Sequence, residues 1–444
     1  MNINSRNVFI IYIFLYFSLL AGFYFNEDFV IGYKVDYYYV HKQFISFFRE
    51  DFVKTLLNFT TIEQNETSFY NTSHSPIYYI FILFLEKISF NETLSRLINL
   101  HISLLIPYFF YLCLRLKYKF QKNDLKILIP CIIFFSPYFR SSSIWQGSEN
   151  LSLILLLISF YFFLKYESNK EKNLSNILLN ALFLACSAYF RPIYVLFSIY
   201  FLLRFYLDLK FSTKLIYYIL LNILLSIPAI YYVFVLEINF FSTHINYGLN
   251  LFRFVNQFSL TISIIFFYSI PFILPLLIQN LKVFLFKIEN VILSIISLYL
   301  LIFYFTYNYP YGGGIFYKVS LLVLDNNYLF YLFFLISLNV LFVILFNSEK
   351  KQNKFIDSIL ILTLIFLEPD RFIYHETYDP LLYFIFFLLI KNKIFLNFTK
   401  KLTNKKFILL ILFCISFFAL SVLKTIYYQI EMPKYQSSRM NLFQ

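Results

Sequence analysis

Long apolar runs, separated by short polar loops, repeat along the whole of this chain. Most of the runs contain roughly 17 to 25 residues, the length that a helix needs to cross the hydrocarbon core of a bilayer. Strands of an outer-membrane barrel would instead alternate polar and apolar residues over about ten positions. The pattern therefore predicts an all-α integral membrane protein.

About thirteen runs alternate consistently across the membrane when the loops rich in Lys and Arg are placed in the cytoplasm. The first run follows a short segment with one Arg and no small-residue cleavage site. We therefore expect a retained span whose amino end is cytoplasmic. The predicted spans lie near residues 8–25, 97–114, 127–139, 149–165, 174–189, 192–207, 215–235, 259–279, 290–306, 327–346, 355–367, 380–390 and 407–424.

The segment 26–96 is the one long polar interruption, and it is predicted to form the first extracytoplasmic loop. Within it, residues 37–57 are amphipathic, which predicts a helix along the membrane surface. Residues 76–90 are apolar but short, and they carry two charges. Because the basic loop after the span at 97–114 belongs in the cytoplasm, residues 76–90 must begin and end outside. We expect a re-entrant or interfacial helix there.

Composition and charge agree with a membrane bundle. Of 444 residues, 60% are hydrophobic and 14% are charged, and the mean hydropathy is +0.69. The net charge of +13 comes from short clusters between apolar runs, which indicates cytoplasmic loops and not nucleic-acid binding. The four cysteines lack the spacing of a zinc site or a disulfide framework. We expect a single polytopic domain over residues 1–444, made of the loop 26–96 and the remaining bundle 97–444.

Ionisable side chains gather in the loops predicted to face outside, so the extracytoplasmic face is the predicted working face. Sugar transfer at a membrane needs a carboxylate that takes the proton of the acceptor hydroxyl, and cations that hold the departing phosphate. Asp28 follows the first span directly, and Asp36 lies shortly after it. Either carboxylate is a candidate general base. The alternative is that both are solvated interfacial acids.

Arg191, in YFRPIYV, stands between two apolar runs, where Pro192 can open the next helix and its N-terminus can add to a phosphate site. Its alternative role is an interfacial anchor. Glu149, in QGSEN, begins a span, where it either contacts substrate or offsets the helix dipole. The glycines at 312–314 are predicted to form a flexible turn and no phosphate loop, since no strand precedes them. The other candidate substrate-contacting residues are His41, Lys42, His74, Arg140, Arg371 and His375.

Several segments resemble the GT-C superfamily of polytopic glycosyltransferases, which use polyprenyl-phosphate-linked sugars. SHSPIYYIFILFLEK is similar to the superfamily's His-Pro-Pro-Leu-Tyr-Tyr segment, with Ser75 in place of a proline. SRLINLHISLLIPYFFYLCLRLK resembles its Arg-Leu span, and FFSPYFRSSSIWQGSENLSLILLLISFYFFLKY resembles its Ser-Pro span, outside turn and following span. The resemblance covers roughly residues 8–210. It implies a GT-C-like fold with interfacial helices in a long first extracytoplasmic loop.

A second likeness is to the alpha-1,2-glucosyltransferases of the dolichol pathway. DYYYVHKQ is similar to that family's acidic-pair loop, GSEN to its outside Glu, FRPIYV to its Phe-Arg-Gln segment and PDRFIYHETYDP to its late Arg-Tyr loop. The chain departs from the family at Tyr37 and Pro192. The resemblance implies that Asp36, or failing that Asp28, is the general base of an inverting transfer. It also implies that Arg191 and Arg371 hold the lipid phosphate.

The sequence thus favours a membrane hexosyltransferase that moves a sugar from a polyprenyl-phosphate carrier to a glycan or lipid acceptor outside the membrane. A bacterial inner membrane with its active face toward the periplasm fits the compact loops. No protein-bound cofactor is required, although a divalent metal is compatible with the resemblance. Two alternatives are a transporter or flippase of lipid-linked saccharides and a non-catalytic subunit of a transferase. Transporters usually place ionisable groups at mid-membrane, whereas here they gather at one face.

Overall fold

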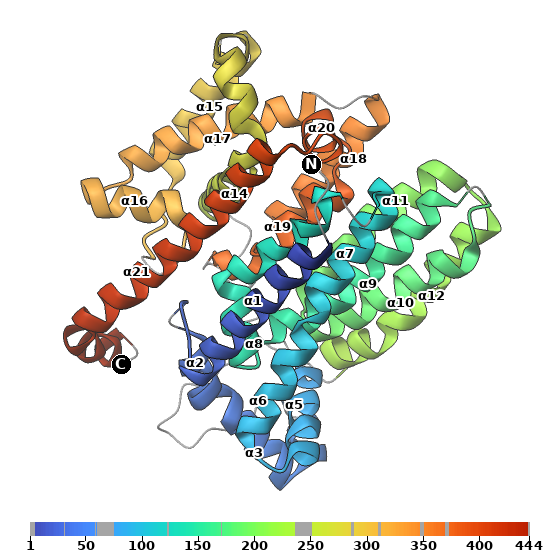
Figure 1. Ribbon diagram of the computed structural model, residues 1–444, viewed down its shortest axis with the longest axis vertical. Coiled ribbons are helices and arrows are strands. Elements are labelled where there is room, and N and C mark those ends of the chain that lie inside the picture. The colour runs from blue at the N-terminus through green and yellow to red at the C-terminus, as the bar shows by residue number, and fades with distance from the viewer. Residues whose placement is uncertain are drawn as a thin grey trace. The chain divides into compact units, whose positions relative to one another are not determined.

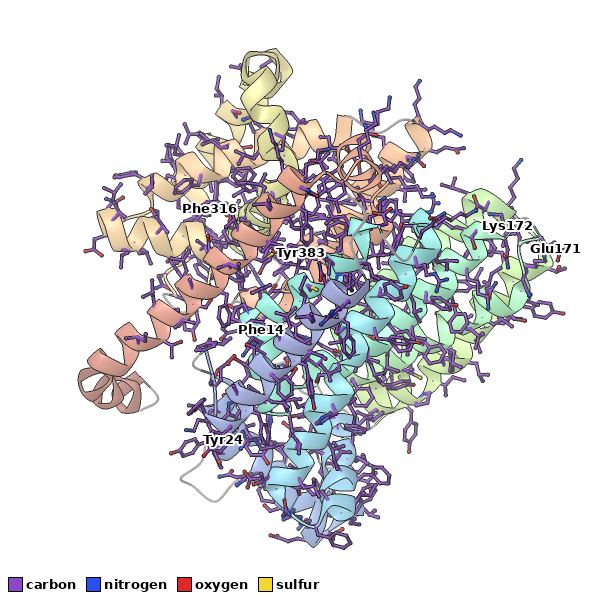
Figure 2. The ribbon with its side chains drawn as sticks, in the orientation of Figure 1. Phe14, Tyr24, Glu171, Lys172, Phe316 and Tyr383 are labelled. Carbon is purple, nitrogen blue, oxygen red and sulfur yellow. The ribbon has the colours of Figure 1, made fainter. Side chains whose placement is uncertain are left out.

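The computed structural model describes residues 5–30, 32–57, 59, 75–121, 124–169, 171–235, 251–285, 288–309, 312–346, 350–368 and 373–442. Every regular element in these ranges is helical, and no β-strand occurs among them (Figure 1). Apolar side chains also cover the outside of helices: on α1 (Ser5–Tyr24), Phe14 is 72% and Tyr24 is 79% exposed (Figure 2). Such surfaces require lipid around them. The prediction of an all-α integral membrane protein is confirmed.

In the described part of the chain, fewer helices than the predicted thirteen are candidates for crossing the membrane. Within the described ranges, eight helices are long and apolar enough to cross a membrane, or nine if the bent pair Leu125–Phe135 and Pro137–Ile144 is one span. A helix of 15 to 17 residues reaches only about 22 to 26 Å, against a hydrocarbon core of about 30 Å. Three predicted spans coincide with helices of this length: α10 (Leu174–Phe190), α15 (Ile288–Tyr304) and α18 (Lys351–Ile365). A fourth coincides with the still shorter α19 (Leu381–Phe384) and the π-helix η6 (Ile385–Leu389).

The chain divides into two compact units and passes between them within α12 (Thr213–Ile230) and α21 (Asn404–Leu442). The first unit comprises Met1–Pro192, Leu220–Phe240 and Ile411–Gln444. The single domain expected over residues 1–444 stays a prediction. Besides α1, α10 and parts of α12 and α21, the described elements of the first unit are α2 (Tyr33–Asp36), η1 (Tyr37–His41), α3 (Lys42–Glu50), α4 (Phe52–Leu57), α5 (Pro76–Ser89), α6 (Glu92–Ser103), α7 (Leu105–Tyr118), η2 (Leu125–Phe135), α8 (Pro137–Ile144), α9 (Ser148–Ser168) and η4 (Tyr231–Val235).

Helix α9 is the centre of the first unit, because it packs against both α7 and α10 (Figure 1). Polar side chains join α9 to α10 inside this packing. The amide of Asn180 donates hydrogen bonds to the hydroxyl and the carbonyl of Ser159, at 2.8 and 3.0 Å, and the Ser159 hydroxyl donates to the Asn180 carbonyl. Reciprocal bonds between small polar residues are a common way to hold membrane helices together. They fix α9, whose first turn carries Glu149.

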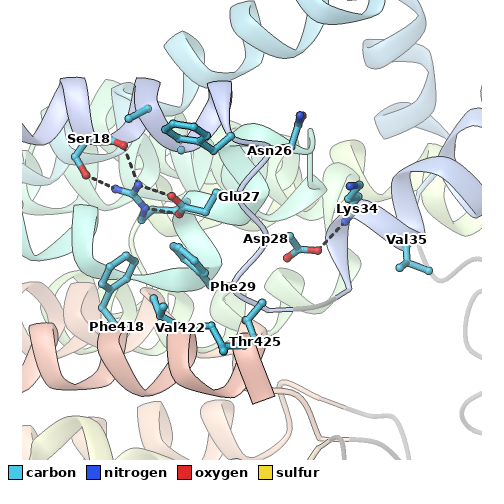
Figure 3. A pocket seen from close by; sticks show the side chains of 15 residues that line it. Ser18, Asn26, Glu27, Asp28, Phe29, Lys34, Val35, Phe418, Val422 and Thr425 are labelled. Carbon is cyan, nitrogen blue, oxygen red and sulfur yellow. Dashed lines mark hydrogen bonds and ion pairs between the residues drawn. The ribbon is translucent and has the colours of Figure 1, made fainter. Parts of the chain in front are cut away.

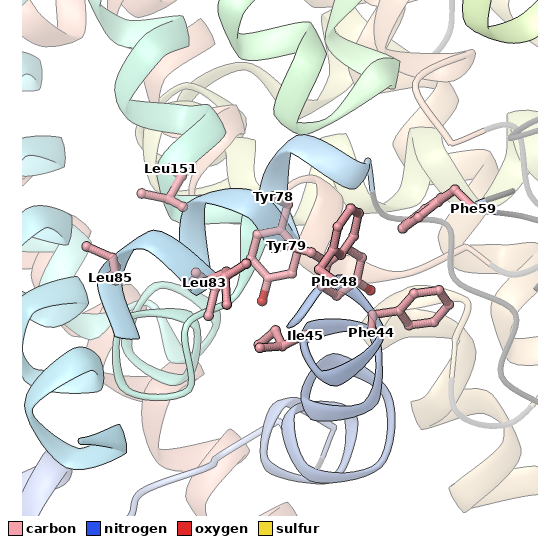
Figure 4. Packing of buried hydrophobic residues seen from close by; sticks show 10 residues of the cluster. Phe44, Ile45, Phe48, Phe59, Tyr78, Tyr79, Leu83, Leu85 and Leu151 are labelled. Atoms are coloured by element: carbon pink, nitrogen blue, oxygen red, sulfur yellow. The ribbon is translucent and has the colours of Figure 1, made fainter. Parts of the chain in front are cut away.

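The amphipathic helix α3 does not offer its apolar face to lipid. Phe44, Ile45 and Phe48 are buried against Tyr78 and Tyr79 of α5 (Figure 4). Phe44 stacks on Tyr79 with ring centroids 5.0 Å apart. The sequence predicted a surface helix over 37–57, because the spacing of apolar residues cannot distinguish a face covered by lipid from one covered by protein. The predicted helix at 76–90 is observed as α5, and it is not among the candidate spans.

The second unit comprises Ile193–Ile219 and Phe241–Leu410. Helix α14 packs there against α15, α16 and α17. Besides α15, α18, α19, η6 and parts of α12 and α21, its described elements are η3 (Pro192–Leu196), α11 (Phe197–Leu209), α14 (Leu251–Leu285), α16 (Gly314–Leu324), α17 (Tyr328–Phe346), η5 (His375–Thr377) and α20 (Lys393–Lys400).

The predicted glycine turn is tightly packed in the described part of the second unit. Gly313 and Gly314 have φ of +79° and +80°, a conformation that favours glycine. The Gly313 N–H donates to the Ile373 carbonyl at 2.8 Å. A Cβ on Gly314 would lie 3.3 Å from the Nε2 atom of His375. The glycines therefore allow close approach to the 373–375 segment, so their role is packing, where the sequence predicted flexibility.

Candidate functional site

An open pocket of about 670 Å³ lies beside the carboxyl end of α1 in the first unit (Figure 3). One part of its lining is apolar, formed by Phe25, Phe29, Phe418, Val422 and Ile426. Another part is polar and charged, formed by Asn26, Glu27, Asp28, Lys34 and Arg140. We call it the open pocket. A lining of this kind suits a molecule with an apolar chain and a charged head.

The strongest contact in the open pocket is a bidentate ion pair between Glu27 and Arg140. The Arg140 Nε and Nη2 atoms lie 2.5 and 2.6 Å from the two carboxylate oxygens, and the two side chains are 6% and 4% exposed. Arg140 also donates to the carbonyl and hydroxyl of Ser18, at 3.0 and 3.2 Å. Gly22 leaves room for this pair, since a Cβ there would collide with the Glu27 carboxylate. Arg140, a predicted substrate contact, is thus engaged within the protein.

Asp28 has a local structural role. Its carboxylate accepts the backbone N–H groups of Val30 at 3.2 Å and Lys34 at 3.0 Å. Carboxylates that bind nearby backbone N–H groups in this way stabilise turns. Asp28 therefore shapes the entry to α2, and both of its oxygens are occupied by that task.

Trp145 connects the open pocket with the interior. Its indole N–H donates to the Glu27 carbonyl at 2.9 Å, and its side chain is 1% exposed. The Arg96 guanidinium lies 3.7 Å from the ring centroid, and the Lys34 ammonium lies 5.6 Å from it. Cations at these distances are attracted by the face of the ring. Trp145 therefore anchors the turn between α8 and α9 to the first loop.

Residues on both sides of Trp145 in the chain form, together with Arg191, a second polar group, the buried cluster, made of Ser142, Gln146, Glu149 and Arg191. The Glu149 carboxylate lies 3.4 Å from the Arg191 guanidinium, with side chains 7% and 14% exposed. Gln146 is fully buried; its side-chain amide donates to the Ser95 hydroxyl at 2.9 Å, and its backbone carbonyl accepts from the Tyr78 hydroxyl. The cluster joins the two positions of QGSEN and FRPIYV that the sequence singled out separately.

Within the described ranges, three oxygen atoms of the buried cluster lack a hydrogen-bond partner: Oε2 of Glu149, Oε1 of Gln146 and Oγ of Ser142. All three residues are at most 5% exposed. Gly147 lets two of these atoms approach each other. A Cβ on Gly147 would lie 2.5 Å from both the Glu149 Oε2 and the Ser142 Oγ atoms. Buried polar atoms without partners are costly.

The first loop contributes Asp36, which is exposed at the end of α2. Burial raises the pKa of the Tyr78 phenol well above its usual value, and the carboxylates of Glu149 and Asp36 add to that effect. His41 is 3% exposed and packs its ring on Tyr78, with centroids 5.1 Å apart.

Lys42 lies on the outer side of this region, where it pairs with Glu92 at 2.6 Å and covers the Tyr38 ring at 4.4 Å. His375 belongs to the second unit, where its Nδ1 atom lies 3.4 Å from the Tyr268 hydroxyl. His74 and Arg371 fall outside the described residues. The first unit thus brings together Asp36, His41, Glu149 and Arg191, and it places Asp28 and Arg140 at the open pocket.

Sequence reasoning missed Glu27, Arg96 and Gln146, although their positions in the loops were visible. A single Trp beside QGSEN was the one signal that could have marked this turn, since the chain contains no other Trp. No group of three or more His, Cys, Asp or Glu side chains that could hold a metal ion occurs in the described part of the chain.

In comparisons with known proteins, no family model, no curated protein and no solved structure matches the chain.

Proposed function

We propose that the protein is a membrane glycosyltransferase that moves a sugar from a polyprenyl-phosphate-linked donor to an extracytoplasmic glycan or lipid acceptor. The observation that carries the proposal is the ion pair between Glu149 and Arg191, which come from distant parts of the chain and whose side chains are 7% and 14% exposed. Asp36 is an exposed carboxylate of the same unit. Carboxylates in such different environments are suited to separate acid–base and binding tasks.

Asp36 is the proposed general base, and Asp28 is the weaker candidate. Each carboxylate oxygen of Asp28 accepts a backbone N–H group, and these bonds hold the carboxylate in the turn before α2. Asp36 lies at the exposed end of α2, where an acceptor can reach it. The proposed step moves the acceptor proton to Asp36 while the acceptor oxygen displaces the lipid phosphate from the sugar carbon.

The open pocket is the proposed place of the lipid phosphate and the first part of the polyprenyl chain. Lys34 is exposed in its lining, and an ammonium group is a suitable partner for phosphate. Phe25, Phe29 and Phe418 supply an apolar lining, with the rings of Phe29 and Phe418 in edge contact at 5.1 Å. In this arrangement Arg191 pairs with Glu149 and does not bind the phosphate. The resemblance to the GT-C enzymes implies a further phosphate contact by Arg371.

The same proposal includes the orientation drawn from the sequence: a cytoplasmic N-terminus, a bacterial inner membrane, and an active face toward the periplasm. The excess of Lys and Arg in alternate loops supports the orientation. Cysteine labelling at positions 75 and 91 tests it. Both positions should react from outside, and a cytoplasmic position 91 would overturn the topology.

The test of function is sugar transfer by the purified protein from a panel of polyprenyl-phosphate hexoses and pentoses to an envelope lipid extract. Asp36→Asn should lower kcat by about 100-fold or more, as expected for loss of a general base. The matched control is Asp51→Asn, an exposed carboxylate that caps α4 through the Lys54 N–H. It should transfer at the wild-type rate.

Two results would contradict the proposal. Absence of transfer from every donor by folded, lipid-bound protein would favour the flippase or the non-catalytic subunit. Equal transfer by wild type, Asp36→Asn and Asp28→Asn would remove the general base assigned here.

A further inference from the structure

We infer that a basic surface on the second unit binds the headgroups of anionic phospholipids. The basic surface is formed by four exposed lysines on and beside α20: Lys393, Lys400, Lys401 and Lys405. They belong to the segment 391–406, which contains six lysines and no Asp or Glu. The inference goes beyond the proposed function and does not depend on it.

Helix α20 turns its apolar side to the protein and its lysines to the outside. Phe395 and Phe398 are buried, and their ring centroids lie 5.0 and 4.7 Å from that of Phe272 in α14. An amphipathic helix that enters a membrane surface needs its apolar side for the lipid. Because protein already covers that side of α20, the charged side is what remains to meet a headgroup.

Hydrogen bonds hold both ends of the segment in place. At the start of α20, Asn392 is the N-cap and its side-chain amide donates to the Ile344 carbonyl of α17. At the start of α21, the Thr403 hydroxyl accepts the Lys406 N–H at 3.4 Å, and the Lys406 ammonium donates to the Lys401 carbonyl at 3.3 Å. The exposed lysines therefore stand on a fixed backbone, which reduces the entropy lost when they bind an anion.

No carboxylate of the described part of the chain forms an ion pair with the four lysines of the basic surface. The ion pairs observed there, such as that of Lys42 with Glu92 at 2.6 Å, lie in other regions. Lys393 and Lys405 also lie in the first turns of α20 and α21, where the helix dipole disfavours cations and favours anions. Positive charge and two helix N-termini thus act together to attract anions.

The position of the basic surface selects a lipid from among the anions. Lys405 begins the segment Asn404–Ile426 of α21, which is long and apolar enough to cross a membrane. The tendency of cytoplasmic loops to be basic would explain the lysines, but it requires neither a fixed helix nor the absence of paired carboxylates. Clusters of about four to eight Lys or Arg beside the cytoplasmic end of a membrane helix attract anionic lipids.

The experiment places a fluorophore beside the basic surface, in the full-length protein in phosphatidylcholine nanodiscs. Asn397→Cys provides the attachment point on the exposed side of α20, and Cys186→Ala removes the one cysteine that is not fully buried. The quenchers are phosphatidylglycerol and phosphatidylcholine, each with a nitroxide near the top of the acyl chain and at equal mole fraction. We expect phosphatidylglycerol to be enriched at the fluorophore by at least about fivefold, the effect of one Lys near an anionic headgroup. The preference should disappear at about 1 M NaCl, where the Debye length is about 3 Å.

The test variant replaces all four lysines of the basic surface with glutamine, and both lipids should then quench equally. Lys400→Gln combined with Lys401→Gln is a smaller variant, in case the fourfold one does not fold, and it should reduce the preference. The matched control removes the same charge from four exposed residues of the first unit and should keep the wild-type preference; it combines Lys54→Gln, Lys87→Gln, Arg115→Gln and Lys119→Gln.

Four results would overturn the inference. The first is equal quenching by the two lipids in the wild type, and the second is an undiminished preference in the folded fourfold variant. The third is an equal loss in the matched control, which would assign the effect to the net charge of the protein. The fourth is loss of the preference on adding inorganic phosphate at constant ionic strength, which would assign the lysines to a soluble anion.

Discussion

The open pocket and the buried cluster differ in how their polar groups are satisfied. In the open pocket, Glu27 has Arg140 as a bidentate partner and Asp28 accepts two backbone N–H groups. In the buried cluster, Glu149 and Gln146 each keep an oxygen without a partner in the described ranges. A buried charge that loses its partner is strongly destabilising, and a buried polar atom that has no partner carries a cost that a ligand can remove. The comparison therefore separates structural carboxylates from those proposed to meet substrate.

The largest expected effect is on the free energy of unfolding, at the Glu27–Arg140 ion pair of the open pocket. Glu27→Gln leaves the Arg140 guanidinium buried without its counter-charge, so unfolding should become easier by about 3–5 kcal/mol. Thermal unfolding in detergent measures it. Glu86→Gln is the control, because its partner Arg49 has a side chain 56% exposed, and it should cost no more than about 1 kcal/mol. A small loss at Glu27 together with lost transfer would make the ion pair part of the substrate site.

A smaller effect is expected at Gly147 in the buried cluster. Gly147→Ala places a Cβ 2.5 Å from the Glu149 Oε2 and Ser142 Oγ atoms, and the resulting displacement should cost about 1–3 kcal/mol. It should also change the emission of Trp145. Gly32→Ala is the matched control, since a Cβ there meets only the Asp36 carboxylate, at 3.8 Å. Equal stability of the two variants would show that the Glu149 and Ser142 side chains can move away from a Cβ at position 147 without cost.

The smallest effect concerns Tyr37, which is fully buried and whose ring centroid lies 5.9 Å from that of Trp145. Burial raises the pKa of its phenol above the ordinary value, with the charges of Glu92 and Glu86 adding to the shift. The folded-state pKa thus exceeds that of the unfolded chain. Tyr37 therefore contributes stability below about pH 10, which is lost as the pH rises further.

Tyr37→Phe removes that dependence. Its free energy of unfolding should match the wild type at pH 7 and exceed it above about pH 10, by up to ~1.4 kcal/mol per pH unit. Thermal unfolding across alkaline pH measures the difference. Tyr39→Phe is the control, because it removes a phenol hydroxyl from a side chain that is 61% exposed. A parallel pH profile for wild type and Tyr37→Phe would contradict the described burial.

The candidate site was predictable only in its separate parts. Glu149 and Arg191 were visible in the sequence as polar residues at the ends of apolar runs, but nothing in their spacing places them 3.4 Å apart. Arg140 was predicted to contact substrate, because sequence reasoning cannot show that Glu27, far away in the chain, occupies its donors. The roles of Asp28 and Asp36 could not be separated either, since the backbone N–H groups that Asp28 accepts depend on the turn before α2.

The sequence by itself determined the class of this protein. Runs of apolar residues long enough for a bilayer specify helices, because only a helix satisfies its own backbone hydrogen bonds in lipid. The tertiary structure alone decided which apolar faces meet protein, as in the burial of Phe44 and Phe48 under α5. It also decided which charged groups have partners, because ion pairs and hydrogen bonds join residues that are distant in the chain. The hydrophobicity of a segment depends only on its own residues, whereas the partner of a charged group depends on which distant residues the fold brings next to it.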